Sequence, residues 1–173
     1  MNVAIRTKTA VTRARGDAAP IESPQASSAL VAALNTLLAD MFSLYLKTKN
    51  FHWHVSGPHF RDYHLLFDEQ ATQIVETTDA IAERVRKIHG RTVHSIGHVA
   101  RLQRLKDNDQ AVVAPQAMLL ELMADNRALG AWLHEAHRIC DEVGDVASAS
   151  LIEIWIDEAD KRAWFLHEAS RAA

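Results

Sequence analysis

The chain has 173 residues, 48% of them hydrophobic, so it is long enough to fold as one domain around a substantial core. A formal net charge of −3 gives no overall electrostatic reason to bind nucleic acid or a membrane surface. One cysteine, Cys140, excludes an intrachain disulfide and is expected to be a small buried apolar residue. Because the sequence shows neither a secretion signal nor a long uninterrupted apolar run, we expect a cytoplasmic protein without membrane contact.

Residues 1–27 differ in composition from the rest of the chain. They are rich in small residues and contain Pro20 and Pro24, which is typical of a mobile tail preceding a domain over 28–173. The tail carries four basic residues that are candidates for DNA contact, Arg6, Lys8, Arg13 and Arg15. A basic arm repeated around an oligomer would favour binding to DNA phosphates, but without interleaved aromatic residues the pattern is equally typical of a leader that touches nothing.

Two long helices are predicted in the first half of the domain. Apolar residues at three- and four-residue spacing predict a helix over 29–55, with Ser27 and Ser28 as candidate N-caps. A Ser-Gly-Pro break ends it. A second helix is predicted over 59–89, because neither Gly nor Pro interrupts its apolar stripe, and Gly90 is expected to end it.

The second half repeats this arrangement after a long connection over 91–113, in which a short helix is expected near 99–105. Pro115 suits the first position of a third long helix that runs to about Val143, where Gly144 terminates it. The last helix is predicted over about 147–169. Four long helices joined by one long middle connection predict an all-α crossover four-helix bundle.

The second helix and the turn before it hold five side chains of metal-binding type, His52, His64, Asp68, Asp79 and Glu83. His64 and Asp68 are four residues apart, as are Asp79 and Glu83, so each pair projects from one face of the helix. The turn can bring His52 back towards His64. Two imidazoles and three carboxylates form a mixed nitrogen and oxygen set that suits ferrous iron, with zinc or manganese as competitors.

The two pairs cannot hold the same ion within one chain. Fifteen residues separate His64 from Asp79, which is about 22 Å along a helix axis, whereas metal–ligand bonds are about 2 Å long. If two copies pack antiparallel across a two-fold axis, the first pair of one copy faces the second pair of the other, and symmetry produces two such sites. The site is therefore predicted to need a second copy.

The run KTKNFHWHVSGPHFRDYHLLFDEQ, continued by DAIAERVRKIHG, resembles the signature of the Dps family, the miniferritins or DNA-binding proteins from starved cells. The resemblance covers nearly everything from Leu30 to Leu166, and it implies a ferritin-like four-helix bundle that assembles into a hollow homododecamer. The family's ferroxidase ligands, which lie at two-fold interfaces, fall on His52, His64, Asp68, Asp79 and Glu83. Each of these positions holds the residue that the family pattern expects.

The resemblance implies a ferroxidase and iron store. Two ferrous ions bind at the shared site, hydrogen peroxide takes two electrons in preference to dioxygen, and ferric oxyhydroxide collects inside the shell, which protects DNA from oxidative damage. Delivering both electrons together avoids the release of hydroxyl radical. Trp53 stands where the family has a tryptophan near the iron, and it is expected either to scavenge stray oxidant or to pack at the interface.

Two alternatives stand beside this interpretation. Ferritins build a diiron site inside one bundle from Glu-x-x-His pairs, and no glutamate of this chain has a histidine three positions later, which favours the shared site. The other alternative is a DNA-compacting nucleoid shell whose metal chemistry is weak or different. The intact ligand set counts against that shell, while the basic tail keeps direct DNA binding open as an addition.

An acidic cluster near the end of the third helix, Asp141, Glu142 and Asp145, stands where family members line a pore through which iron enters. Such a pore would concentrate ferrous ions. The family's following Thr-Ala-Asp is here Ser148-Ala149-Ser150, so one expected pore acid is missing, and the cluster is equally typical of a solvated helix end.

Six other histidines are conspicuous. His54 and His59 flank the turn and are expected beside the site or simply on the surface. Two further pairs at helical spacing are expected to be solvated or to bind adventitious zinc, namely His94 with His98 and His134 with His137.

Overall fold

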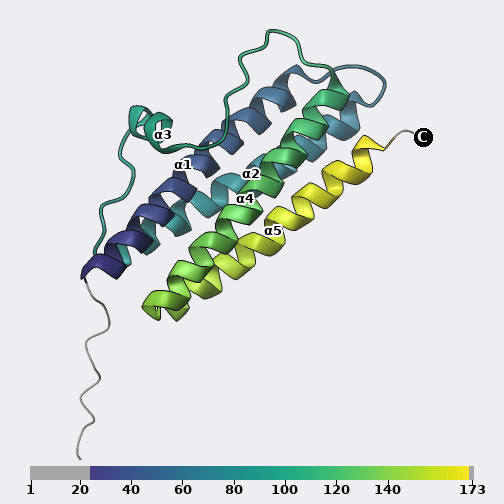
Figure 1. Cartoon of the computed structure of the whole chain (residues 1–173). Helices are drawn as coiled ribbons and strands as arrows, with labels where there is room; N and C mark the ends of the chain where they lie inside the picture. The colour runs from purple at the N-terminus through teal and green to yellow at the C-terminus, as the bar shows by residue number, and fades with distance from the viewer. Residues whose placement is uncertain (1–23, 172–173) are drawn as a thin grey trace, which may run out of the picture.

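A computed structural model describes residues 24–171, and within that part of the chain five helices are present. They are α1 (Pro24–His54), α2 (Phe60–Lys87), α3 (Ile96–Leu102), α4 (Pro115–Val143) and α5 (Val146–Ser170). The four long helices lie side by side as a bundle, and the connection carrying α3 crosses its outer side (Figure 1). The predicted all-α four-helix bundle with a short helix in the crossover is confirmed. The basic residues Arg6, Lys8, Arg13 and Arg15 lie outside the described residues.

The core is built from two helical hairpins, because α1 packs chiefly on α2 and α4 chiefly on α5, while α1 also contacts α4. Over Ser28–His54, α1 is apolar and long enough to pass as a membrane span by length and composition alone. Much of its apolar surface instead faces the other helices: Leu30, Leu34 and Leu44 have no solvent exposure, although Leu46 and Trp53 are exposed. The bundle core therefore accounts for the apolar stripe of α1.

The ends of α1 and α3 differ from the sequence predictions. α1 begins at Pro24, so Ser27 and Ser28 lie inside the helix and do not cap it. A proline at the first helical position has its backbone already set for a helix, and its missing N–H would have had no partner there. α3 begins three residues earlier than predicted, because Ser95 caps it by accepting a hydrogen bond from the backbone N–H of His98 (3.1 Å).

The end of α2 also corrects the prediction for Gly90. The residue with a left-handed backbone is His89 (φ 64°), and the N–H of Gly90 donates to the carbonyl of Val85 (2.8 Å), as in a Schellman motif. Gly90 is needed for a different reason. A Cβ atom there would lie 2.7 Å from a methyl of Val31 and 2.9 Å from one of Val85. The missing side chain therefore lets α1 and the end of α2 approach closely.

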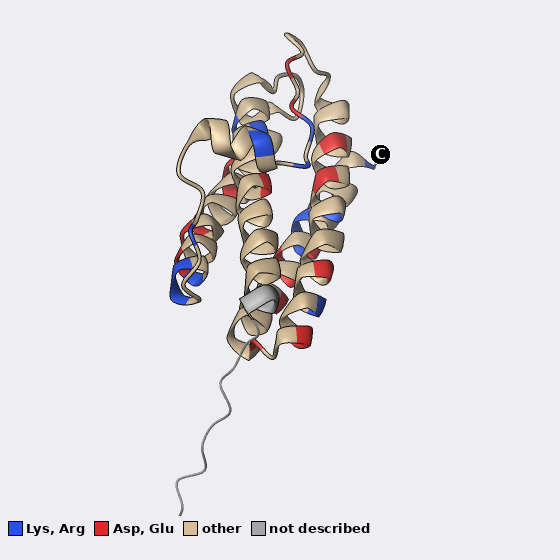
Figure 2. Cartoon of the chain, turned by 60° about the vertical axis from the view of Figure 1, so that its left-hand side comes forward, with Lys and Arg blue, Asp and Glu red and all other residues tan. Residues whose placement is uncertain are grey.

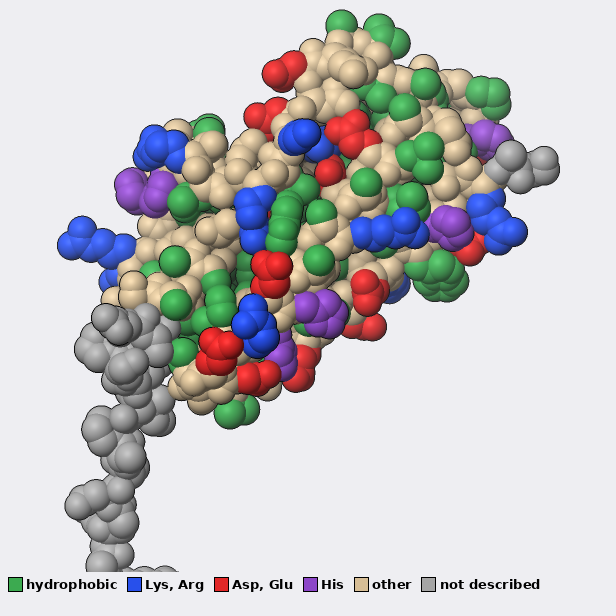
Figure 3. All heavy atoms as spheres, viewed as in Figure 1, with side chains coloured by type: hydrophobic (Ala, Val, Ile, Leu, Met, Phe, Trp, Pro, Cys, Tyr) green, Lys and Arg blue, Asp and Glu red, His purple; other side chains and the backbone are tan. Residues whose placement is uncertain are grey.

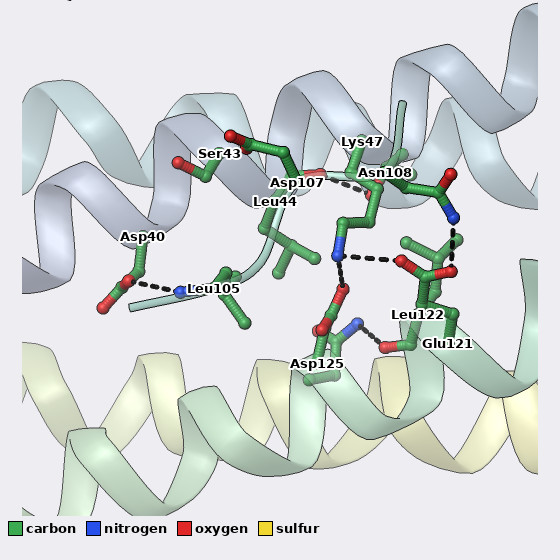
Figure 4. A network of polar contacts seen from close by, with 12 residues as sticks. Asp40, Ser43, Leu44, Lys47, Leu105, Asp107, Asn108, Glu121, Leu122 and Asp125 are labelled. Carbon is green, nitrogen blue, oxygen red and sulfur yellow. Dashed lines mark hydrogen bonds and ion pairs between the residues drawn. The ribbon is translucent and has the colours of Figure 1, made fainter. Parts of the chain in front are cut away.

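Two buried polar contacts tie the crossover and α4 to α1. The Asp40 carboxylate, which has no solvent exposure, accepts hydrogen bonds from the backbone N–H and guanidinium of Arg104 and from the N–H of Leu105. Lys47 reaches from α1 to Asp125 (2.7 Å) and Glu121 (3.0 Å) on α4, as Figure 4 shows. Because Asp40 and Lys47 would be costly to leave unpaired in the interior, the first holds the crossover against α1 and the second holds α4 against α1.

We expect Gly90→Ala to lower the free energy of unfolding, because the added methyl meets two valines whose β-branched side chains cannot swing away. Overpacking of this kind costs about 1–3 kcal/mol. Thermal unfolding of the variant measures the loss. Gly97→Ala is the matched control, because its Cβ would meet nothing closer than the flexible guanidinium of Arg101 at 3.5 Å. Equal melting temperatures for both variants would contradict this account of Gly90.

Candidate metal site

His52 and His64 face each other across the turn between α1 and α2. Their rings stack with centroids 3.8 Å apart, and the Nδ1 atom of each lies 2.8 Å from the backbone carbonyl oxygen of the other. A carbonyl oxygen only accepts hydrogen bonds, so in the neutral form of each ring the proton is on Nδ1 and the lone pair is on Nε2. Fixing the tautomer through the other ring nitrogen is how proteins prepare histidines as metal ligands.

Asp68 lies one helical turn beyond His64 on α2 and approaches the same place. Its Oδ1 is 3.8 Å from the Nε2 of His52, and its side chain is 49% exposed. The structure thus brings together three of the five predicted ligands at the start of α2. Within residues 24–171, however, no three His, Cys, Asp or Glu side chains converge closely enough to hold an ion.

Lys49 is a participant that the sequence reasoning missed. Its Nζ donates to Asp68 Oδ1 at 2.6 Å, and this hydrogen bond is the main influence that holds the pKa of Asp68 below its usual value of 3.8. The available signal was the spacing, since Lys49 precedes His52 by three residues and so shares its face of α1. A cation already sits where the first half of the ligand set would bind one.

The other two predicted ligands lie farther along α2, on its surface. Asp79 is exposed, and Glu83 is 57% exposed with its carboxylate 2.8 Å from the Nζ of Lys87. This hydrogen bond lowers the pKa of Glu83. Because α2 is one helix from Phe60 to Lys87, nothing in it bends Asp79 and Glu83 back towards His64. The structure does not bring the two halves of the set together within one chain.

The interior of the bundle is poorly suited to a metal ion. Arg162 on α5 is only 2% exposed, and its Nε donates to the side-chain oxygen of Asn126 on α4 at 2.8 Å. Burial lowers the pKa of Arg162 to about 10, which still leaves its guanidinium charged at neutral pH. A fixed positive charge between the helices disfavours a ferritin-type diiron site there.

The acidic cluster at the end of α4 separates into one structural residue and two exposed ones. Asp145 is buried, pairs with Arg84 on α2 and caps α5 by accepting from the N–H of Ser148 (3.0 Å). Asp141 lies 3.2 Å from His137, and Glu142 lies 3.1 Å from Arg138. Asp145 is therefore already committed to holding α2 and α5 together.

The remaining candidates are on the surface. Trp53 is 58% exposed, and His54, His59, His134 and Ser150 are also exposed. The Nδ1 of His54 lies 2.8 Å from the carbonyl of Asn50, within its own helix. Figure 2 shows acidic and basic positions interspersed along the described helices. Trp53 and His54 directly follow His52 at the end of α1, and both are exposed.

Comparisons with known proteins add an independent finding. A family model for the ferritin-like domain matches residues 31–171. The chain is 36% identical to an uncharacterized low temperature-induced protein of Nostoc sp., over 77% of this chain and 75% of that protein. It is 31% identical to the DNA protection during starvation protein of Agrobacterium fabrum, over 82% of this chain and 87% of that protein.

A solved structure extends this similarity to three dimensions. The DPS protein from Vibrio cholerae O1, described as a member of a broad superfamily of ferritin-like diiron-carboxylate proteins, superposes with a TM-score of 0.81. The two are 25% identical, and the match covers 85% of this chain and 92% of that one.

We expect Lys49→Met to raise the pKa of Asp68 towards 3.8, because the variant removes the hydrogen bond and the charge that stabilise the ionised carboxylate. A carboxyl carbon NMR titration measures this pKa. Lys87→Met serves as the control, since it should raise the pKa of Glu83 and leave the pKa of Asp68 unchanged. If Asp68 titrates identically in the wild type and in Lys49→Met, Lys49 does not hold that carboxylate in solution.

Proposed function

The chain belongs to the Dps family of ferritin-like proteins, and on that premise we propose that it is a ferroxidase that stores the iron it oxidises. Ferrous iron is the substrate, the ligands are His52, His64, Asp68, Asp79 and Glu83, and each site is shared by two copies within a hollow homododecamer. The ferric product collects inside the shell. By removing ferrous iron and oxidant together, the protein protects DNA in the cytoplasm.

The observation that carries this proposal is the reciprocal bonding of His52 and His64. Both Nδ1 atoms are held by backbone carbonyls, which leaves both Nε2 atoms to bind a metal ion, and the Nε2 of His52 lies 3.8 Å from the Asp68 carboxylate. Imidazole nitrogen suits ferrous iron, and carboxylate oxygen is the harder ligand that favours the ferric state. His52 is buried, while His64 and Asp68 are partly exposed, and together the three form a half-site that a second molecule can complete.

Asp79 and Glu83 supply the other half in this proposal. Both are exposed on α2, and along the helix axis Asp79 lies about 22 Å and Glu83 about 28 Å from His64. An antiparallel two-fold pairing places them over the half-site of the partner and doubles the arrangement by symmetry. Zinc and manganese suit the same nitrogen and oxygen ligands and are expected to compete with iron.

The proposed reaction moves one electron from each of two ferrous ions to one molecule of hydrogen peroxide. The peroxide O–O bond breaks, two protons are taken up, and two water molecules leave with two ferric ions formed. Dioxygen is the alternative oxidant. The protein holds Asp68 in its ionised form before iron arrives, because the hydrogen bond from Lys49 keeps its pKa low. Iron binding then requires the Nζ of Lys49 to move away from the carboxylate.

Direct DNA binding is a separate part of the proposal, carried by the tail residues Arg6, Lys8, Arg13 and Arg15, and a mobility assay tests it. The alternative of a DNA-compacting shell without fast iron oxidation predicts retention of DNA and equally slow oxidation by the wild type and ligand variants.

We expect Glu83→Ala to slow the oxidation of ferrous iron by about tenfold or more, since even residues that only support a metal ligand typically change affinity or activity by 10- to 100-fold. Stopped-flow absorbance with peroxide and with dioxygen measures the rate. Glu76→Ala, an exposed glutamate on the same helix outside the ligand set, should oxidise iron at the wild-type rate. Equal rates for Glu83→Ala and the wild type would contradict the proposed ligand set.

Mixed shells test whether each site is shared. His64→Ala and Asp79→Ala should each be inactive alone, but a pair containing one copy of each variant has one site with both changes and one intact site. Random mixing in equal amounts should therefore restore about a quarter of the wild-type activity. Mixing His64→Ala with Asp68→Ala, which damage the same half, should restore none. Rescue that is absent from the first mixture would show that both residues act within one chain.

A further inference from the structure

His94 and His98 form a second histidine pair, on the crossover, that the proposed iron chemistry does not use. His94 is exposed and His98 is half-buried, and their Nδ1 atoms lie 3.3 Å apart with ring centroids separated by 4.5 Å. Histidine side chains are visible at the surface beside α3 in Figure 3. The pair belongs to the segment between α2 and α4, so it is distinct from the half-site at the start of α2.

The bonding of this pair differs from that of His52 and His64. There, each Nδ1 is held at 2.8 Å by a backbone carbonyl, whereas here the two Nδ1 atoms point at each other. Among residues 24–171, the one other partner of either atom is the carbonyl oxygen of Thr92, at 3.4 Å from His94 Nδ1, which is beyond the usual range for a strong hydrogen bond. Two imidazole nitrogens thus lie next to each other on the crossover, with no backbone carbonyl holding either of them closely.

The separation of the two nitrogens matches one edge of a tetrahedral metal site. Zinc–nitrogen bonds are about 2.0–2.1 Å long, so two nitrogens on a tetrahedral zinc ion lie about 3.3 Å apart. We propose that His94 and His98 bind a divalent transition cation of the zinc or copper class through their Nδ1 atoms, with water in the remaining positions. An all-imidazole pair suits these cations, which also bind nitrogen ligands more strongly than ferrous iron does.

The backbone around the pair is fixed before any cation arrives. Ser95 caps α3 by accepting from the N–H of His98 through both its hydroxyl oxygen (3.1 Å) and its carbonyl oxygen (3.0 Å). One residue of the pair precedes this cap and the other lies in the first turn of the helix. A bound cation would therefore link the loop to α3 and stabilise that junction by mass action.

Isothermal titration calorimetry with Zn²⁺ tests the proposal. The full-length assembly is first treated with a chelator to remove bound metal. A His64→Ala background removes one ligand of the proposed iron site, so the test does not depend on that site. We expect the His64→Ala background to bind one Zn²⁺ per chain at the crossover site. Adding either His94→Ala or His98→Ala to this background should abolish that binding. Adding His134→Ala instead, an exposed histidine on α4, should leave it intact.

Thermal unfolding gives a second readout. Zn²⁺ should raise the melting temperature of the His64→Ala background and of its His134→Ala control, and this shift should be lost when His98 is replaced. The proposal is overturned if the background binds no Zn²⁺ at the crossover, if the two crossover variants bind as the background does, or if only one of the two residues proves necessary.

Discussion

The rise of a single α-helix is the constraint on which the account of this protein depends. α2 contains 28 residues without a glycine or proline, and it carries His64 and Asp68 near its start and Asp79 and Glu83 in its second half. A helix advances about 1.5 Å per residue, so the two halves stay far apart however the side chains rotate. Everything that keeps α2 straight also keeps one chain from completing the site alone.

The bundle orients α2 so that its two faces have separate roles. Phe67, Ile74 and Ile81 have no solvent exposure and pack into the core. With that face of α2 buried, Asp79 and Glu83 on the other side are exposed to solvent. The hairpin between α1 and α2 places His52 beside His64. Lys49 pairs with Asp68 and Lys87 pairs with Glu83, which favours the ionised form of one carboxylate in each half. Core packing thus sets the geometry, and local ion pairs set the charge state.

Much of this arrangement could be predicted from the sequence because it depends on local rules. Pro115 and Gly144 mark the ends of α4, and the four-residue spacings place each ligand pair on one face of α2. Features that depend on tertiary contact could not be predicted. His89 takes the left-handed position, while Gly90 is needed for close packing against Val31. From the sequence Asp145 is typical of a solvated acid at a helix end. In the structure it accepts a hydrogen bond from Arg84, which is 61 residues earlier in the chain.

The central claim is that two copies of the chain build each iron site together. Anomalous diffraction at the iron edge, from crystals of the assembly soaked anaerobically in ferrous iron, tests it most directly. We expect an iron peak bounded by His64 and Asp68 of one copy and by Asp79 and Glu83 of another. A peak confined to the interior of one bundle, near Asn126 and Arg162, or no peak beside His64, would contradict it.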